Sequence, residues 1–240
     1  MADALLQIEG LSKRFGGIVA TDDVTLSIPT GELHAIIGPN GAGKTTLIAQ
    51  LTGQLAPDQG HVRFAGEDIT AVPTWQRSLI GIARSFQITS LLLDLSVIDN
   101  VSLAVQAHAG HSFQFWRNAR KDAALTEPAM AALARVGLRQ LELAMALAGR
   151  PRMLLLDEPM AGKGPDESAR MVALLRELKK EYTILLIEHD MEAVFALADR
   201  SSVLVYGRVI ATGKPEDIRA NAEVRQAYLG DDGTGSGHHG

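Results

Sequence analysis

Short runs of hydrophobic residues alternate with stretches of helical spacing along most of the chain. Residues 5–8 and 24–28 alternate apolar and polar positions, which predicts half-buried strands and an antiparallel edge at the N-terminal end. Mainly apolar runs predict buried strands at 32–37, which becomes apolar towards its end, 153–156 and 183–188, and helices are predicted at 44–51, 168–180 and 191–198. Buried strands that alternate with helices indicate an α/β fold with a mainly parallel, covered sheet.

A block of about residues 88–148 has a different pattern. Strand-like runs are absent there, and apolar residues such as Met130 and Leu133 follow helical spacing. We therefore expect an inserted helical subdomain at 88–148, between the two parts of a core formed by residues 1–87 and 149–230. The Gly- and Asp-rich segment 231–240 is expected to be a disordered tail.

Composition excludes several classes of function. The 240 residues are 46% hydrophobic and 21% charged, which suits one α/β domain with a small subdomain. Cysteine is absent, so disulfides, thiolate metal sites and cysteine nucleophiles are excluded. The net charge of -5 argues against broad capture of nucleic acid or anionic lipid, and no nucleic-acid partner is expected. The N-terminus does not resemble a signal peptide, and the apolar runs are too short to span a bilayer.

Residues 38–45 carry the clearest chemistry. Their sequence, Gly-Pro-Asn-Gly-Ala-Gly-Lys-Thr, matches the P-loop pattern in full. The glycines let backbone N–H groups converge on phosphate oxygens, and the helix that begins near Lys44 adds the positive end of its dipole. Lys44 is expected to reach the β- and γ-phosphates, and the Thr45 hydroxyl to ligate Mg²⁺. A chance glycine turn is the alternative, but the apolar strand before the loop and the helix after it argue against that.

Two predicted strands end in polar residues that belong beside this loop. The run 153–156 is followed by Asp157 and Glu158, and the run 183–187 is followed shortly by His189. Ligands of parallel sheets bind at the carboxyl ends of the strands. Asp157 is then placed to hold Mg²⁺, Glu158 to polarise an attacking water, and His189 to donate to the γ-phosphate. Taken alone, such residues are more often plain strand ends, and it is the P-loop that favours the functional interpretation.

These motifs, in this order, resemble the ATP-binding cassette (ABC) ATPases from about residue 6 to residue 229. The resemblance implies a P-loop NTPase with an N-terminal antiparallel β part. It also implies that Phe15 stacks on adenine, that Gln87 touches Mg²⁺ and water, and that Glu158 is the general base. The implied nucleotide-binding residues are Phe15, Gly38, Pro39, Asn40, Gly41, Ala42, Gly43, Lys44, Thr45 and Thr46; the implied metal ligands are Thr45, Gln87 and Asp157; the implied catalytic residues are Lys44, Gln87, Glu158 and His189.

Finer features are similar to the branched-chain amino acid branch of ABC importers. They are Ile-Ala-Arg-Ser-Phe-Gln at 82–87, Ile-Glu-His-Asp-Met at 187–191 and Val-Arg-Gln-Ala-Tyr-Leu-Gly at 224–230. This similarity implies an ATP- and Mg²⁺-dependent subunit that powers uptake of branched-chain or other hydrophobic amino acids from the cytoplasmic side of the cell membrane. The implied partners are a second ABC ATPase subunit, identical or different, integral membrane permease subunits and, indirectly, a solute-binding protein. Urea and amide importers and lipopolysaccharide-export ATPases share some of these features and remain alternatives.

The sequence departs from the family at two places. The signature, Leu-Ser-Gly-Gly-Gln or a variant, is missing between Leu138 and Arg139, where one predicted helix ends at Gly137 and the next begins without a cap. The hypothesis is that a dozen or more disordered residues are missing from the printed sequence; a Cα–Cα distance of about 3.8 Å at this join would instead imply a real deletion. The second departure is Lys163-Gly164, where the family has an apolar residue followed by Asp or Asn.

A real deletion of the signature would cripple hydrolysis, because the signature binds the γ-phosphate held by the partner subunit. A nucleotide-binding regulatory module without hydrolysis is therefore one alternative. A soluble ABC protein of DNA repair or translation is another, although such proteins usually carry coiled-coil insertions or a second cassette, which this chain lacks.

Overall fold

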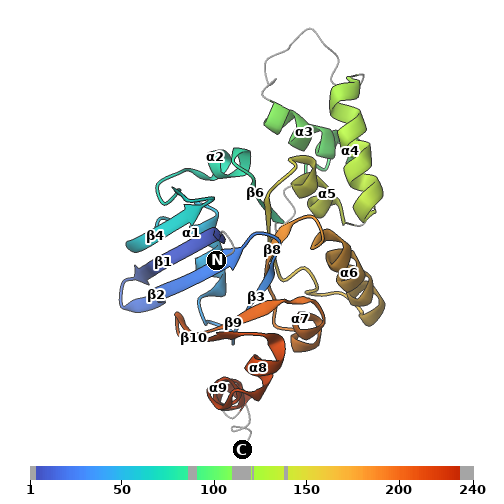
Figure 1. The fold of residues 1–240 in the computed structure, drawn as a ribbon. Coiled ribbons are helices and arrows are strands. Elements are labelled where there is room, and N and C mark those ends of the chain that lie inside the picture. Colours follow the sequence, from blue (N-terminus) through green and yellow to red (C-terminus); the bar gives the residue numbers. More distant parts are fainter. Residues whose placement is uncertain (1–3, 86–90, 110–119, 121, 138–139, 233–240) are drawn as a thin grey trace, which may run out of the picture.

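The computed structural model describes residues 4–85, 91–109, 120, 122–137 and 140–232, in two sheets with helices around them (Figure 1). Gln87, Leu138 and Arg139, all of which carry predictions from the sequence, lie outside these ranges. Within the described part of the chain, no helix is long and apolar enough to cross a membrane.

The N-terminal strands form an antiparallel sheet in the order β2-β1-β4-β5. Its strands are β1 (Ala4–Phe15), β2 (Ile18–Pro29), β4 (Gln59–Phe64) and β5 (Glu67–Asp68). The predicted N-terminal antiparallel part is confirmed, and it forms a sheet separate from the parallel one. The reason is that the apolar faces of β1 and β2 pack against the larger sheet, where Leu6 and Val24 share a core with Ile36 and Leu155.

The larger sheet has the order β10-β9-β3-β8-β7-β6. Its strands are β3 (Leu33–Ile37), β6 (Ile82–Ser85), β7 (Met153–Asp157), β8 (Thr183–Ile187), β9 (Arg200–Val205) and β10 (Arg208–Gly213). All neighbouring pairs are parallel except the β9–β10 hairpin. Strands β3, β7 and β8 are buried along their whole length, as their mainly apolar sequences predict. The predicted mainly parallel, covered sheet is therefore confirmed.

Helices of the core cover this sheet. They are α1 (Lys44–Leu51), α2 (Thr74–Leu79), α6 (Pro165–Leu178), α7 (Met191–Leu197), α8 (Pro215–Ala220) and α9 (Ala222–Asp232). Helix α6 begins three residues before the predicted start because Pro165 occupies its first turn, where a missing N–H costs nothing. Helix α9 continues to Asp232, so the first two residues of the predicted tail are helical.

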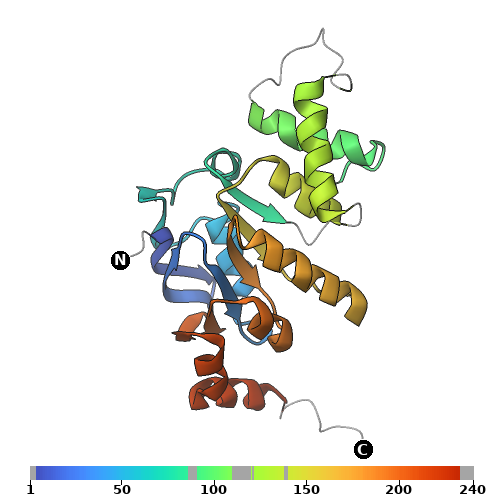
Figure 2. The same ribbon diagram turned by 45° about the vertical axis from the view of Figure 1, so that its right-hand side comes forward.

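Three further helices lie together at one end of the molecule (Figures 1 and 2). They are α3 (Val97–Ala109), α4 (Ala123–Val136) and α5 (Leu141–Ala148). Asp122 caps α4 by accepting from the N–H of Ala124, and Gly137 ends it with a φ of 78°, as predicted from the glycine. Buried residues of all three helices join a core that continues into β7 and β8. The division at residues 88 and 148 stays a prediction.

Candidate functional site

The loop of residues 38–43 joins β3 to α1 and lies very close to neighbouring backbone. A Cβ on Gly38 would stand 2.1 Å from the carbonyl oxygen of Leu204, and one on Gly43 would stand 2.1 Å from that of Ala20. Gly43 also has a φ of 103°, which side chains rarely tolerate. These two glycines therefore let the loop approach β9 and β2 as closely as it does.

The β9–β10 turn is hydrogen-bonded both to this loop and to β2. The N–H of Gly207 donates to Ala42 (2.9 Å), and the carbonyl of Gly207 accepts from the N–H of Asp22 (2.8 Å). Gly207 has a φ of 80°, which places it in the left-handed region that glycine favours. The loop is thus fixed by backbone hydrogen bonds from a turn more than 150 positions away in sequence.

Lys44 is the first residue of α1 and its side chain is buried. Its Nζ donates to the carbonyl oxygens of Gly38 (2.6 Å) and Pro39 (2.9 Å). Burial lowers the pKa of Lys44, and the nearby carboxylates of Glu158 and Asp157 raise it in part. The first turn of α1 carries no acidic residue, so the positive end of the helix faces the loop unneutralised. Thr45 is exposed and Thr46 half-buried.

The two carboxylates follow β7 as predicted. Asp157 is the last residue of the strand and is buried, whereas Glu158 has a φ of 47° and turns away from the strand direction. The N–H of Glu158 donates to the carbonyl of Ile187 in the neighbouring strand (2.9 Å). This bond fixes the residue in a conformation that costs free energy for a side chain other than glycine.

The imidazole of His189 lies beside Glu158. Its Nδ1 is 3.7 Å from Oε1 of Glu158, and its side chain is 60% exposed. Because β3, β8 and β7 are adjacent parallel strands, the P-loop after β3, His189 after β8 and Glu158 after β7 meet at one sheet edge. The structure therefore brings together the three groups that the sequence placed in one pocket, while their individual roles stay predictions.

The predicted adenine-stacking residue lies on the hairpin beside the loop. Phe15 ends β1, its side chain is half exposed, and Nζ of Lys13 lies 5.8 Å from the centre of its ring. The partner strand β2 carries Ala20, the residue that Gly43 approaches. Gln87, the remaining predicted ligand, lies outside the described residues.

Sequence reasoning gave no role to Glu188, which is fully buried. Its Oε1 accepts from the N–H of Met160 (2.9 Å) and its Oε2 from the N–H of His189 (3.2 Å). Glu188 thereby ties the segment after β7 to the segment that carries His189. Burial raises the pKa of this carboxyl, and its backbone hydrogen bonds act against that shift. A charged residue that ends a uniformly apolar strand was the available signal.

Arg84 was also given no role of its own. It lies in β6 next to β7, and its guanidinium contacts the side chains of Asp157 (3.0 Å) and Gln54 (2.6 Å). No signal in the sequence shows this pairing, because it depends on which strand neighbours β7.

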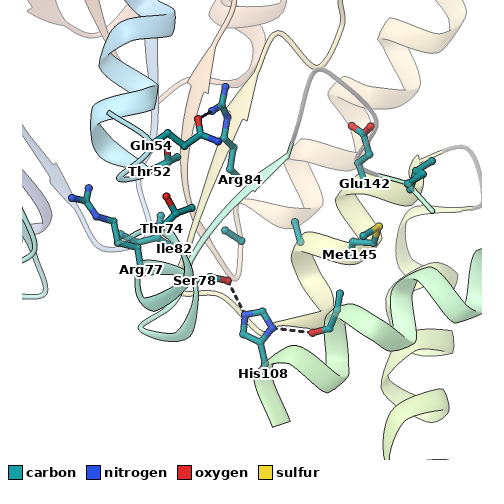
Figure 3. Close-up of a pocket in the computed structure, with 14 residues that line it drawn as sticks. Thr52, Gln54, Thr74, Arg77, Ser78, Ile82, Arg84, His108, Glu142 and Met145 are labelled. Atoms are coloured by element: carbon teal, nitrogen blue, oxygen red, sulfur yellow. Dashed lines mark hydrogen bonds between the residues drawn. The ribbon is translucent and has the colours of Figure 1, made fainter. Parts of the chain in front are cut away.

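Arg84 also lines a cavity of about 210 Å³, drawn in Figure 3, between the core and the three-helix end of the molecule. At this cavity the side chain of His108 in α3 contacts α2 of the core. Its Nδ1 donates to the carbonyl of Ala104 (2.9 Å), and its Nε2 lies 3.0 Å from the hydroxyl of Ser78 in α2. The rest of the lining is mixed: Ile82 and Met145 lie on opposite sides, and polar residues such as Thr74 and Glu142 also contribute.

Lys163, the departure noted after Asp157 and Glu158, makes an intramolecular contact. Its Nζ donates to the carbonyl of Pro159 (2.5 Å), and its charge lowers the pKa of Glu142 in α5, which burial raises more strongly. The charge of Lys163 is thus partly offset inside its own chain.

The side chains at this site suit Mg²⁺ only in combination with phosphate oxygens. No group of three His, Asp or Glu that could hold a metal occurs in the described ranges. The hydroxyl of Thr45 and the carboxylate of Asp157 are hard oxygen donors, and Mg²⁺ is usually held by one or two carboxylates together with substrate phosphates. The donor set therefore fits Mg²⁺ that arrives with a nucleotide.

Comparison with known proteins agrees with this geometry. A family model described as "ABC transporter" matches residues 21–161, and one described as "Branched-chain amino acid ATP-binding cassette transporter" matches residues 208–234. The chain is 37% identical to the high-affinity branched-chain amino acid transport ATP-binding protein BraF of Pseudomonas aeruginosa, with 96% of this chain and all of BraF covered. It is 35% identical to the corresponding protein LivG of Escherichia coli K12, with the same coverage.

A solved ATP-binding cassette of an ABC transporter, in its ADP conformation, has a TM-score of 0.82 and 29% identity, with 95% of this chain and 99% of that chain covered. The alignment with BraF has 254 positions, whereas 96% of 240 residues is about 230. About two dozen positions of BraF therefore have no counterpart in this chain. That number is large enough to include the signature segment whose absence was noted in the sequence.

Proposed function

The chain belongs to the ABC transporter family and is an ATP-binding, ATP-hydrolysing cassette, and from this premise we propose that it powers the uptake of branched-chain or other hydrophobic amino acids. The observation that carries the proposal is the second family match, at residues 208–234, which describes branched-chain amino acid cassettes. Two relatives that span almost the whole chain are transport proteins for the same class of cargo.

The chain's own residues account for phosphate binding. Backbone N–H groups of residues 40–45 and the N-terminus of α1 bind the β- and γ-phosphates. Lys44 exchanges its bonds to the carbonyls of Gly38 and Pro39 for bonds to phosphate oxygens, and Phe15 stacks on the adenine. Thr45 and Asp157 would hold Mg²⁺, which would neutralise charge on the phosphates.

Glu158 and His189 act on the attacking water and the γ-phosphate. Glu158 orients the water and accepts its proton, and His189, 3.7 Å away, donates to the γ-phosphate oxygens. The hydrogen bond from Glu158 to Ile187 and the contact of Glu188 with His189 hold both residues in position. Most of the acceleration comes from positioning and charge neutralisation, because phosphoryl transfer needs little covalent chemistry from protein.

The partner is a membrane permease that docks around the cavity of Figure 3. Several large apolar side chains are exposed on the elements beside it, on α2, on α3 and just before α3: Trp75, Leu79, Ile80, Leu92, Leu93, Val97 and Leu103. Apolar side chains that gather on a surface favour burial against another protein. These exposed side chains support a peripheral subunit on the cytoplasmic side of the membrane.

A second ABC subunit completes the site. In the family, ATP lies between the P-loop of one cassette and the signature of the other. The missing signature before Arg139 and the two dozen unmatched positions leave one alternative to test, a nucleotide-binding module that does not hydrolyse ATP by itself. Sequencing the gene across codons 138 and 139 distinguishes these possibilities. A signature encoded there supports an ATP-hydrolysing transport subunit, and a true deletion supports a nucleotide-binding module without hydrolysis.

The test uses the complex purified from membranes with its permease subunits. Glu158→Gln should lower ATP turnover by about 100-fold or more while ATP binding stays within about twofold, because only proton transfer is removed. Glu177→Gln, which changes an exposed carboxylate on α6, serves as the matched control and should leave turnover unchanged. Turnover retained in Glu158→Gln contradicts the assignment of the base. In vesicles, ATP-driven uptake of urea without uptake of leucine would contradict the assigned cargo.

A further inference from the structure

Arg84 joins three separate parts of the nucleotide site. It stands in β6 beside Leu155 of β7, and its two terminal nitrogens point to different partners. Nη2 donates to Oδ2 of Asp157 (3.0 Å), and Nη1 donates to Oε1 of Gln54, which follows α1 (2.6 Å). Figure 3 shows the guanidinium of Arg84 against the side chain of Gln54.

The Arg84–Asp157 pair is shielded from water. The two side chains are 13% and 5% exposed, so this pair is far less screened by solvent than a surface salt bridge. A planar guanidinium can hold two partners in fixed directions, which a single ammonium cannot do. Gln54 therefore fixes the direction in which Arg84 presents its charge to Asp157.

We propose that Arg84 is a positioning residue that keeps Asp157 from binding a divalent cation until the cation arrives together with ATP. The inference rests on the proposed role of Asp157 as a metal ligand. Arg84 holds one oxygen of the carboxylate and places a positive charge beside any cation at this position. A free divalent cation is repelled by this charge, whereas a cation complexed with ATP brings negative phosphates that offset the repulsion.

For binding of a cation by Asp157, the repulsion from the charge of Arg84 is a larger effect than the orientation that Arg84 gives the carboxylate. A positive charge in a site shielded from water repels a nearby cation strongly, because little solvent screens the two charges. Holding a short side chain in one orientation contributes less, because such a side chain has few rotamers to lose. Removal of the guanidinium should therefore increase the affinity for a free divalent cation, although Asp157 becomes less well oriented.

The test measures binding of Mn²⁺ alone, by electron paramagnetic resonance without nucleotide. Arg84→Gln should bind Mn²⁺ about fivefold more tightly than the wild-type chain or better, whereas Arg84→Lys, which keeps the charge, should stay within about twofold of it. Arg120→Gln, which removes an arginine from an exposed pair with Asp99, is the matched control and should change nothing. An unchanged or weaker Mn²⁺ affinity in Arg84→Gln overturns the proposal.

Substitution of Asp157 distinguishes a failure of this inference from a failure of the proposed function. The added variant Asp157→Asn should abolish the gain of Arg84→Gln in Mn²⁺ affinity, and a gain that survives means that the cation binds elsewhere. Asp157→Asn alone should weaken Mg²⁺-dependent ATP binding. If it does not, the role of Asp157 as a metal ligand fails. If it does and Arg84→Gln has no effect, only the role of Arg84 fails.

A measurement on the wild-type chain covers the case in which Arg84→Gln does not fold. The Nη2 protons of Arg84 should give a protected nuclear magnetic resonance signal, because they are hydrogen-bonded in the shielded pair with Asp157. Addition of ATP with Mg²⁺ should shift that signal or remove its protection, and ATP alone should change it less. A signal that Mg²⁺ and ATP leave unchanged overturns the proposal.

Discussion

Alanine at Gly43 would test how closely the phosphate loop must approach β2. The new Cβ would stand 2.1 Å from the carbonyl oxygen of Ala20, whereas ordinary contacts begin at 3.4 Å, so the two segments must separate by more than 1 Å. A left-handed φ costs alanine about 1–2 kcal/mol, and overpacking typically costs about 1–3 kcal/mol more. We expect Gly43→Ala to lower the free energy of unfolding by about 2–5 kcal/mol and to weaken ATP binding at least about tenfold.

Gly41→Ala is the matched control for this variant. Gly41 also has a positive φ, of 78°, but a Cβ there meets nothing within 4 Å. Its replacement should cost only the conformational part, about 1–2 kcal/mol. Urea denaturation of both variants gives the difference, and titration with a fluorescent ATP analogue gives the affinities. Equal losses of stability, within about 0.5 kcal/mol, would refute the close approach as the reason for glycine at position 43.

Three further predictions concern single side chains near the site. Phe15→Ala should raise the Kd for ATP about tenfold in a nucleotide titration, because stacking on a base is worth about 1–3 kcal/mol. Ile18→Ala, which changes the neighbouring exposed apolar residue, should leave the Kd unchanged. Equal effects of the two variants would count against stacking. Asp190→Ala should lower the free energy of unfolding, measured by urea denaturation, by about 1 kcal/mol, because Asp190 caps α7 by accepting from the N–H groups of Glu192 and Ala193. An unchanged free energy of unfolding would contradict the cap. The raised pKa of Glu188 means that its carboxyl stabilises the fold fully below its unfolded pKa and loses that contribution as the pH rises through its folded pKa. The stability of the wild-type chain relative to Glu188→Gln should therefore fall from pH 4.5 upward, and a rise would reverse the assignment.

The central part of the site could be predicted from the sequence because parallel strands end at the same edge of a sheet. Two of the mainly apolar runs end next to polar residues, so Glu158 and His189 could be placed beside the P-loop without knowledge of the strand order. The glycines of the loop likewise indicated close backbone contacts, although their neighbours in β2 and β9 could not be identified.

The contacts between side chains on neighbouring strands could not be predicted from the sequence. Arg84 reaches Asp157 only because β6 pairs with β7, and a chain of alternating strands and helices does not reveal which strands are neighbours. The antiparallel strands were predicted too short, since β1 continues through Lys13 and Arg14, whose charge obscures the alternation. The roles of Gln87 and of the join between Leu138 and Arg139 stay predictions.

A crystal structure of the chain with Mg²⁺ and a non-hydrolysable ATP analogue tests the central claim most directly. We expect the phosphates on the backbone of residues 38–45, with Nζ of Lys44 moved from the carbonyls of Gly38 and Pro39 to the phosphate oxygens. Glu158 and His189 should both face the γ-phosphate. A nucleotide bound elsewhere, such as in the cavity beside His108, with Lys44 still bonded to its own loop, would contradict the account.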